Sequence, residues 1–237
     1  SEELKADVIN RLTGTTTKTN VCPNSLFKLN QAFKPTLTRA AYAAAIGTIK
    51  DYIRSGDCYQ TNFTQHFSTS YKGDPWVAYL ALREALPSPF SAYWKWQEHA
   101  VLCISPERFL KVSNSPSGDR LQAETKPIKG TVPRGLSLTE DQERAAALGN
   151  SAKDRAENLM IVDLLRNDLG KNCIPGSVKV PQLFAVESFA NVHHLVSTVT
   201  GDLSDSSSPI ALLRDCFPGG SITGEPKRRA LAIIRVS

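Results

Sequence analysis

Cysteine is sparse and scattered in this chain of 237 residues, which has five cysteines and four histidines. The cysteines stand far apart, at Cys22, Cys58, Cys103, Cys173 and Cys216. No CxxC pair or nearby histidine pair accompanies them, so the spacing of a disulfide framework or a zinc site is missing. We expect reduced thiols, and the one sequon, Asn62–Thr64, has little meaning in a chain that is not secreted.

Long apolar runs are absent as well. The longest, such as Leu159–Val162 and Ala230–Ile234, are far shorter than the about 20 residues that cross a bilayer. The first residues also lack the apolar core of a secretory signal. These absences predict no membrane span and favour a cytoplasmic location.

Charge of one sign is not concentrated anywhere. The net charge of +5 comes from 28 Lys and Arg against 23 Asp and Glu, and acids accompany the bases throughout. A nucleic-acid surface needs a basic patch or stripe. The pattern therefore favours an ordinary solvated surface and no nucleic-acid partner.

Hydrophobic periodicity indicates two helices. Apolar residues from Tyr42 to Ile53 recur at helical spacing, and Gly56 follows as a stop signal. Ser151–Leu169 is the stronger prediction, because Ser151 is a good N-cap and Gly170 ends the pattern.

Short runs rich in aromatic and β-branched residues predict strands around these helices. They are Tyr59–Phe67, Ala92–Trp96, Ala100–Ile104, Phe109–Val112, Ser177–Val180, Leu183–Val186 and His194–Thr200. The mixture of helices and antiparallel strands predicts an α+β fold.

The segment Lys126–Gly135 contains three cations, and its prolines and glycines oppose regular structure. A lysine beside other cations has a lowered pKa, which makes its amine a better nucleophile. Lys129 is therefore either a poised nucleophile or a solvated surface lysine, and from these residues alone the surface interpretation is favoured.

Asp154 and Glu157 lie three residues apart and share one face of the predicted helix. The same face continues through the apolar Ile161 and Leu164, so the carboxylates head a stripe that should be buried. Inward carboxylates need a cation, and hard oxygen ligands suit Mg²⁺. Alternatively, Lys153 pairs with Glu157 on the surface and Asp154 caps the helix.

Glu107 and the histidine pair are weaker candidates when taken alone. Glu107 follows an apolar run at a strand end, where an exposed turn acid beside Arg108 is the simplest interpretation. His193 and His194 begin a strand, and alternation places only one of them on the inner face. A lone inward histidine is more often a core residue than a catalyst.

Residues Phe217–Lys227 are rich in glycine. A phosphate loop is excluded because Glu225 stands where lysine should follow Gly224. A nucleophile elbow is excluded because Thr223 replaces its second glycine. The segment is either a tight backbone that offers N–H groups to a carboxylate or a plain turn before a helix beginning at Pro226.

Six segments together resemble the chorismate-binding enzymes in order and spacing. They are Gly56–Gln60, Ser105–Phe109, Pro127–Thr131, Asp154–Leu164, Val192–Ser197 and Gly219–Gly224. The resemblance covers about residues 33–234 and implies a sandwich of antiparallel sheets flanked by helices. Within this family, lysine in the Pro-Ile-Lys-Gly-Thr motif favours the aminodeoxychorismate synthases, because anthranilate synthases usually carry alanine there.

The resemblance implies a mechanism. Lys129 would attack C2 of chorismate as a neutral amine, while Glu107 acts as general acid for the departing C4 hydroxyl. Ammonia would then add at C4 and expel the lysine, giving 4-amino-4-deoxychorismate for para-aminobenzoate and folate synthesis. The ammonia would come from a separate glutamine amidotransferase subunit.

The same resemblance implies roles for other residues. Glu157 would bind Mg²⁺ directly, with Asp154 in the outer shell, and the metal would hold the substrate's ring carboxylate. His194 would lie near the ring. Residues that would help to seat the substrate are Thr131, Gly219, Gly220, Ser221 and Gly224.

Two departures from the family pattern are visible. Glu225 replaces a small residue and would place a carboxylate beside a site for a dianion. The family also continues beyond Ser237 with further strands and another Mg²⁺ glutamate. We therefore expect a truncated chain, inactive or nearly so, in which residues 1–34 are a residual N-terminal segment and 35–237 are part of a chorismate-binding domain.

Two alternatives stay open. The chain could belong to component I of an anthranilate synthase with an unusual lysine. It could also be a non-catalytic remnant that binds chorismate or the amidotransferase.

Overall fold

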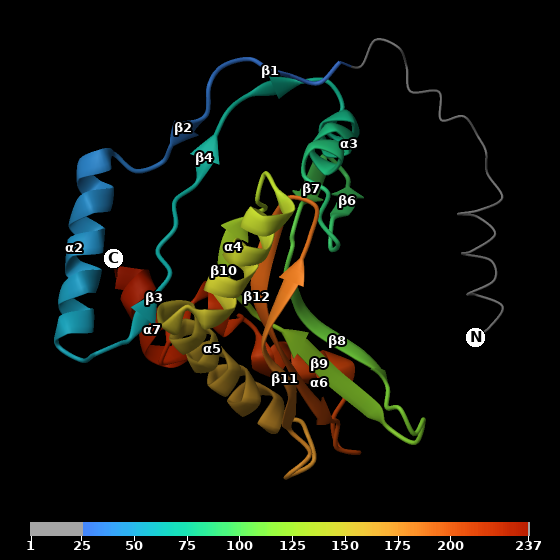
Figure 1. Ribbon diagram of the computed structural model, residues 1–237. Coiled ribbons are helices and arrows are strands. Elements are labelled where there is room, and N and C mark those ends of the chain that lie inside the picture. The colour runs from blue at the N-terminus through green and yellow to red at the C-terminus, as the bar shows by residue number, and fades with distance from the viewer. Residues whose placement is uncertain (1–25, 237) are drawn as a thin grey trace, which may run out of the picture. The chain divides into compact units, whose positions relative to one another are not determined.

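The computed structural model describes residues 26–236 (Figure 1). These residues belong to two compact units. The first unit consists of residues 26–35 and Phe67–Ile104, and the second consists of Thr36–His66 and residues 105–236. Cys22 lies outside the described residues.

The first unit is built from short antiparallel strands and one helix. Its elements are β1 (Lys28–Leu29), β2 (Lys34–Pro35), β4 (Phe67–Ser68), β5 (Tyr71–Lys72), α3 (Pro75–Ala85), β6 (Ala92–Trp96) and β7 (His99–Cys103). β1 pairs with β5, β2 with β4, and β6 with β7. The rings of Trp76, Tyr79 and Tyr93 lie 4.9 to 5.5 Å apart and pack α3 on the β6–β7 hairpin.

The predicted strand Tyr59–Phe67 is wrong over most of its length. Only β3 (Gln60–Thr61) and the first residue of β4 are strand in this range. The chain passes here from the second unit to the first, so its backbone groups meet different partners. β3 pairs with Gly224 and Glu225, whereas β4 pairs with β2.

The second unit contains a five-stranded antiparallel sheet. Its strands are β8 (Arg108–Asn114), β9 (Leu121–Lys126), β10 (Ile128–Pro133), β11 (Lys179–Ser188) and β12 (Val192–Asp202). The long β12 is central: β11 follows one edge, and β10 and then β9 follow the other. This arrangement confirms the predicted α+β class.

The proline- and glycine-rich segment is a strand and not an irregular loop, which corrects the sequence prediction. Proline has no N–H for the ladder, so Pro127 falls between β9 and β10, which lie in succession along one edge of β12. Gly130 has a φ of +91° and lies within the register shift between Ile128 and Thr131.

Helices α4 (Leu138–Asn150) and α5 (Ala152–Gly170) pack on one face of this sheet (Figure 1). The second predicted helix is confirmed, and the Ser151 hydroxyl accepts from the N–H of Asp154 as its N-cap. The main core cluster consists of Ala123, Val162, Leu169, Cys173, Val199, Leu203, Leu212 and Cys216.

The remaining elements of the second unit lie before, within and after the Gly-rich turn in the sequence. They are α2 (Arg39–Arg54), α6 (Pro209–Cys216), the 3-10 turn η1 (Gly220–Ile222), β13 (Gly224–Glu225) and α7 (Lys227–Val236). Ile49 of α2, Cys58 and Ile233 of α7 share a small core. This confirms the first predicted helix. Within residues 26–236, no helix is both long and apolar enough for a membrane span.

Candidate active site

Ser221 joins the two residues predicted to carry the chemistry. The Lys129 ammonium on β10 donates to the Ser221 carbonyl oxygen at 3.4 Å. The Ser221 hydroxyl in turn donates to Oε1 of Glu107 at 3.3 Å. Three segments that lie far apart in the sequence thus meet at one point.

Burial dominates the electrostatics of Glu107. Loss of solvent raises the pKa of the Glu107 carboxyl. The backbone N–H of Ile128, the charge of Lys129 and the Ser221 hydroxyl oppose this rise only in part. Glu107 also lines a pocket of about 310 Å³ with Phe109, and is therefore not a freely exposed turn acid. A carboxyl whose pKa is raised and that lies near an amine is suited to act as a general acid.

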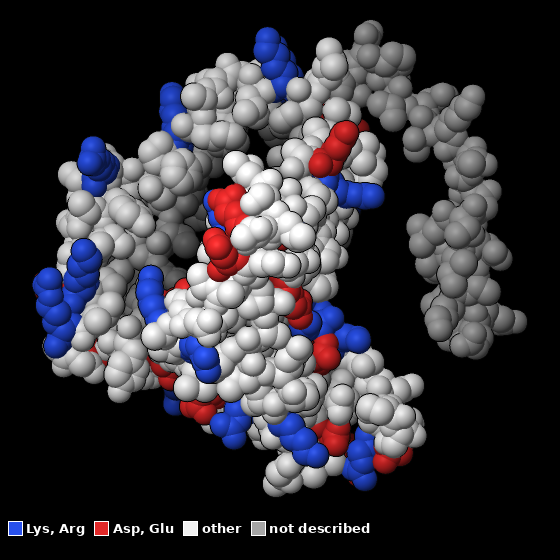
Figure 2. Space-filling view, viewed as in Figure 1, with Lys and Arg blue, Asp and Glu red and all other residues white. Residues whose placement is uncertain are grey.

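The cations near Lys129 do not crowd together as expected. Nζ of Lys126 lies 2.5 Å from Oε1 of Glu187, and Arg134 forms a two-bond pair with Asp141. Strand geometry spreads the three cations over β9, β10 and the residues after β10, and Lys126 and Arg134 each have an acidic partner of their own. Figure 2 likewise shows basic and acidic side chains interspersed over α4 and α5.

The glycines of the 219–224 turn are required by close packing. A Cβ on Gly220 would lie 1.8 Å from Cδ2 of Leu164 in α5, and one on Gly219 would lie 3.1 Å from the Phe109 ring. Gly224 has a φ of +142°, and its Cβ would lie 2.1 Å from the Gln60 carbonyl oxygen. The turn is therefore pressed against its neighbours, which fixes Ser221 opposite Glu107.

Thr131 and His194 form a separate pair on adjacent strands. Oγ1 of Thr131 lies 2.8 Å from Nδ1 of His194. The His194 side chain is buried, which lowers its pKa, and nearby Glu187 opposes the shift. Neither residue lines the pocket of Glu107. The structure thus joins them to each other and not to the Lys129–Ser221–Glu107 cluster.

Both histidines are buried, so burial does not single out one of them as the inward residue. His193 is 2% exposed, with Nε2 at 2.9 Å from Asp141 and Nδ1 at 2.7 Å from the Ser188 hydroxyl. At this point β12 is covered on both sides, because Asp141 of α4 meets His193 while the ring of Phe189 lies 5.4 Å from that of His194.

The predicted metal ligands begin α5 beside the strand of Lys129. A Cβ on Gly130 would lie 3.0 Å from Cβ of Asp154. The predicted stripe is confirmed where Ile161 is buried, but Glu157 is 44% exposed and lies 3.9 Å from Lys153. Asp154 is not the cap, since Ser151 fills that role. Within residues 26–236 no group of three or more His, Cys, Asp or Glu side chains could hold a metal ion.

Sequence reasoning missed Asn62. Its side-chain amide donates to the Ser221 carbonyl oxygen at 2.7 Å, the same oxygen that Lys129 contacts. The sequence drew attention to Asn62 only as a sequon. Its position two residues beyond the Gly56–Gln60 segment was the signal that could have placed it near the site.

Glu225 turns toward acidic residues of α5. Its Oε2 is buried and has no hydrogen-bond partner. Burial, followed by the charges of Asp163 and Asp168, raises the pKa of Glu225, and Lys227 opposes the rise. Glu225 does not line the pocket of Glu107, so the structure does not place it where the sequence analysis expected it.

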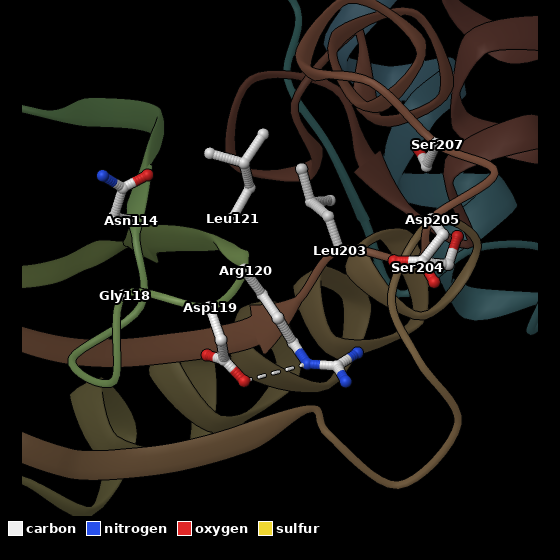
Figure 3. Close-up of a pocket in the computed structure, with 9 residues that line it drawn as sticks. All are labelled: Asn114, Gly118, Asp119, Arg120, Leu121, Leu203, Ser204, Asp205 and Ser207. Carbon is white, nitrogen blue, oxygen red and sulfur yellow. Dashed lines mark ion pairs between the residues drawn. The ribbon is translucent and has the colours of Figure 1, made fainter.

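Another pocket, of about 360 Å³, lies between the β8–β9 turn and the loop after β12 (Figure 3). Asp119 and Arg120 form an ion pair of 3.5 Å there. The pocket shares no residue with the one that contains Glu107. It is thus a separate surface feature.

The second unit thus combines an α+β fold with a cluster in which an acid and an amine meet at a glycine-rich turn. The chain belongs to the chorismate binding enzyme family, which it matches over residues 1–236. Lys129, Glu107 and the turn fall within the segments that carried the resemblance in the sequence.

Relatives and solved structures agree with this assignment. Over 212 residues the chain is 50% identical to aminodeoxychorismate synthase component 1 of Escherichia coli, covering 90% of this chain and 46% of the relative. It is 42% identical to anthranilate synthase component 1 of Synechocystis, covering 80% and 37% of the two chains. The crystal structure of anthranilate synthase component I from Streptococcus pneumoniae superposes with a TM-score of 0.76 at 30% identity, covering 98% and 49%. The chain thus spans about half the length of these proteins or less.

Proposed function

We propose that the protein carrying this chain converts chorismate and ammonia to 4-amino-4-deoxychorismate. The observation that carries the proposal is the contact of Lys129 and Glu107 through Ser221. The higher identity to aminodeoxychorismate synthase component 1 than to anthranilate synthase supports this product.

In the proposed reaction, the neutral amine of Lys129 forms a bond to C2 of chorismate. The ring double bonds shift, the C4–O bond breaks, and Glu107 donates its proton so that the hydroxyl leaves as water. Ammonia then bonds to C4, the double bonds return, and the C2–N bond breaks to release Lys129. Glu107, now a carboxylate, accepts a proton from the incoming nitrogen.

The residues at the start of α5 fit a magnesium site in part. Asp154 and Glu157 supply hard carboxylate oxygens, and Mg²⁺ usually completes its coordination with water and substrate oxygens. We propose that Glu157 binds the ion directly and that Asp154 supports it in the outer shell. When bound, the ion would neutralise the ring carboxylate of the substrate.

We propose a supporting role for the other predicted residues. Thr131 and His194 would flank the ring, and a neutral His194 suits this place because burial lowers its pKa. The Gly-rich turn would seat the substrate, with Gly219, Gly220, Ser221 and Gly224 forming its backbone. Residues 35–237 would form part of a chorismate-binding domain, and 1–34 a residual segment before it.

The relative in Escherichia coli is named as the first component of its synthase. We propose that this protein likewise receives ammonia from a glutamine amidotransferase partner, and that it works in the cytoplasm. An anthranilate synthase, or a non-catalytic remnant, is the alternative that product analysis would identify.

The test is product analysis of the complete protein that contains this chain, incubated with chorismate, Mg²⁺ and an ammonium salt. We expect aminodeoxychorismate, and an enzyme adduct with the mass of chorismate less one water on the Lys129 peptide. Lys129→Ala should abolish both. Lys126→Ala, in the same segment but paired with Glu187, is the matched control and should retain the adduct. Formation of anthranilate would overturn the proposal.

A further inference from the structure

Asn62 and Lys129 share one hydrogen-bond acceptor. The Ser221 carbonyl oxygen accepts from Nδ2 of Asn62 at 2.7 Å and from Nζ of Lys129 at 3.4 Å. The Asn62 bond is short and the Lys129 bond is at the long limit for N–H···O contacts. The amide therefore holds this oxygen more firmly than the amine does.

The backbone of the turn does not depend on the Asn62 side chain. The backbone N–H of Asn62 donates to the Thr223 carbonyl at 2.8 Å. The Thr223 hydroxyl donates to the Gly219 carbonyl at 3.0 Å, and Gly224 pairs with Thr61. These contacts keep Ser221 in place when only the Asn62 side chain changes.

We propose that Asn62 is a positioning residue that keeps the Lys129 amine free to leave the Ser221 carbonyl. The inference rests on the proposed function of Lys129 as nucleophile. A carbonyl oxygen has two lone pairs, and a buried one that loses its donors is destabilised. Because Asn62 still donates when Lys129 turns toward a substrate, the movement leaves no unpaired carbonyl behind.

Asn62 also weakens the bond between the lysine and this oxygen. A second donor on the same oxygen draws on its electron density, so the oxygen is a poorer acceptor for Lys129. Glu107 and Lys129 also interact through their charges, and Asp154 packs on the adjacent Gly130. Neither is changed when Asn62 is substituted.

Competitive acetylation tests the inference on this chain without chorismate. The chain is treated with trace acetic anhydride between pH 6 and 10, and modification of the Lys129 peptide is measured by mass spectrometry. Asn62→Leu removes the donor at similar volume, and Asn62→Ala removes it without adding a charge. In both variants we expect Lys129 to react about three- to tenfold more slowly at pH 8, the size of one neutral hydrogen bond.

The Lys126 peptide separates this role from a merely structural one. The loss of Lys129 reactivity should appear at every pH tested in both variants, while the reactivity of Lys126, which pairs with Glu187, stays unchanged as an internal standard. Thr64→Ala, an exposed neighbour, is the matched control and should leave the reactivity of both lysines unchanged. If the Leu variant fails to fold by circular dichroism, the Ala variant decides. An unchanged or faster Lys129 reaction would overturn the inference.

This experiment and the product assay fail independently. Slower acetylation without a chorismate adduct would contradict the proposed function and leave the link between Asn62 and Lys129 standing. A normal adduct with unchanged acetylation would support the proposed function and contradict the link between Asn62 and Lys129.

Discussion

Two carboxylates of the second unit each lie near a cation, yet their surroundings differ. Asp141 accepts from Nε and Nη2 of Arg134 at 2.7 and 2.6 Å, and also from the N–H of Gly135 and from His193. Glu107 accepts only at 3.3 and 3.4 Å, from Ser221 and from the N–H of Ile128.

The electrostatic outcome is opposite in the two places. Hydrogen bonds from Arg134, followed by the N–H of Gly135, hold the pKa of Asp141 far below its usual range. Desolvation raises the pKa of Glu107 because long hydrogen bonds do not offset it. Short, numerous hydrogen bonds thus make Asp141 a structural anchor, whereas a poorly compensated carboxyl can exchange a proton.

The largest expected effect is on catalysis at Glu107. In the complete protein, Glu107→Gln keeps the shape and the hydrogen bonds but removes the transferable proton. We expect kcat to fall by about 10²- to 10⁴-fold, the usual contribution of a general acid. The measurement is the initial rate of product formation. A variant with more than a third of the original rate would show that Glu107 is not the acid.

The pH dependence sharpens this prediction. A general acid acts while protonated, so the rate should decline as the pH rises through the raised pKa of Glu107. Because the folded-state pKa lies above the unfolded value, the folded state binds the proton more tightly, and stability should also decline as the pH rises across that window. Both declines should be missing in Glu107→Gln, and a persisting decline would assign them to another group.

Asp141→Ala should have the next largest effect, on stability. It leaves the buried His193 and the N–H of Gly135 without their acceptor and Arg134 without its counterion. We expect a clear fall in Tm by circular dichroism. Because the pKa of Asp141 is depressed, this difference from the original chain should persist from pH 8 to 5 and shrink only in strong acid.

The neighbouring Glu140 provides the matched control for Asp141. It is not one of the hydrogen-bond partners of the His193 ring, which are Asp141 and Ser188. Its side chain is 37% exposed and pairs with Arg144. Glu140→Ala should therefore lower Tm much less, and equal losses would contradict the anchor role of Asp141.

Local signals predicted the fold where packing did not override them. The cap at Ser151 and the apolar spacing of α2 were sufficient to place two helices. Tyr59–Phe67 failed because strand propensity does not reveal that two halves of one segment pair in different units. β10 was missed because the position of Pro127 at a gap between two strands depends on the register with β12.

The residues of the candidate site also fall into those that the sequence predicted and those that it did not. Glu107, Lys129 and Ser221 were predicted only through the family resemblance, since each residue alone had an ordinary surface interpretation. Asn62 was missed because its role depends on a contact across 159 residues of sequence. His193 contacts Asp141, a residue of α4. No feature of the histidine pair in the sequence could indicate that contact.

The smallest expected change in stability is at Glu157, which is half-exposed and only 3.9 Å from Lys153. Glu157→Gln should alter the free energy of unfolding by less than about 0.5 kcal/mol, because exposed ion pairs contribute little. If Glu157 binds Mg²⁺, the Mg²⁺ concentration for half-maximal rate of the complete protein should rise at least about tenfold. Lys153→Gln breaks the same ion pair without removing a ligand, so it should leave the Mg²⁺ requirement unchanged. Equal Mg²⁺ requirements in the two variants would place the metal elsewhere and leave Glu157 as a surface acid.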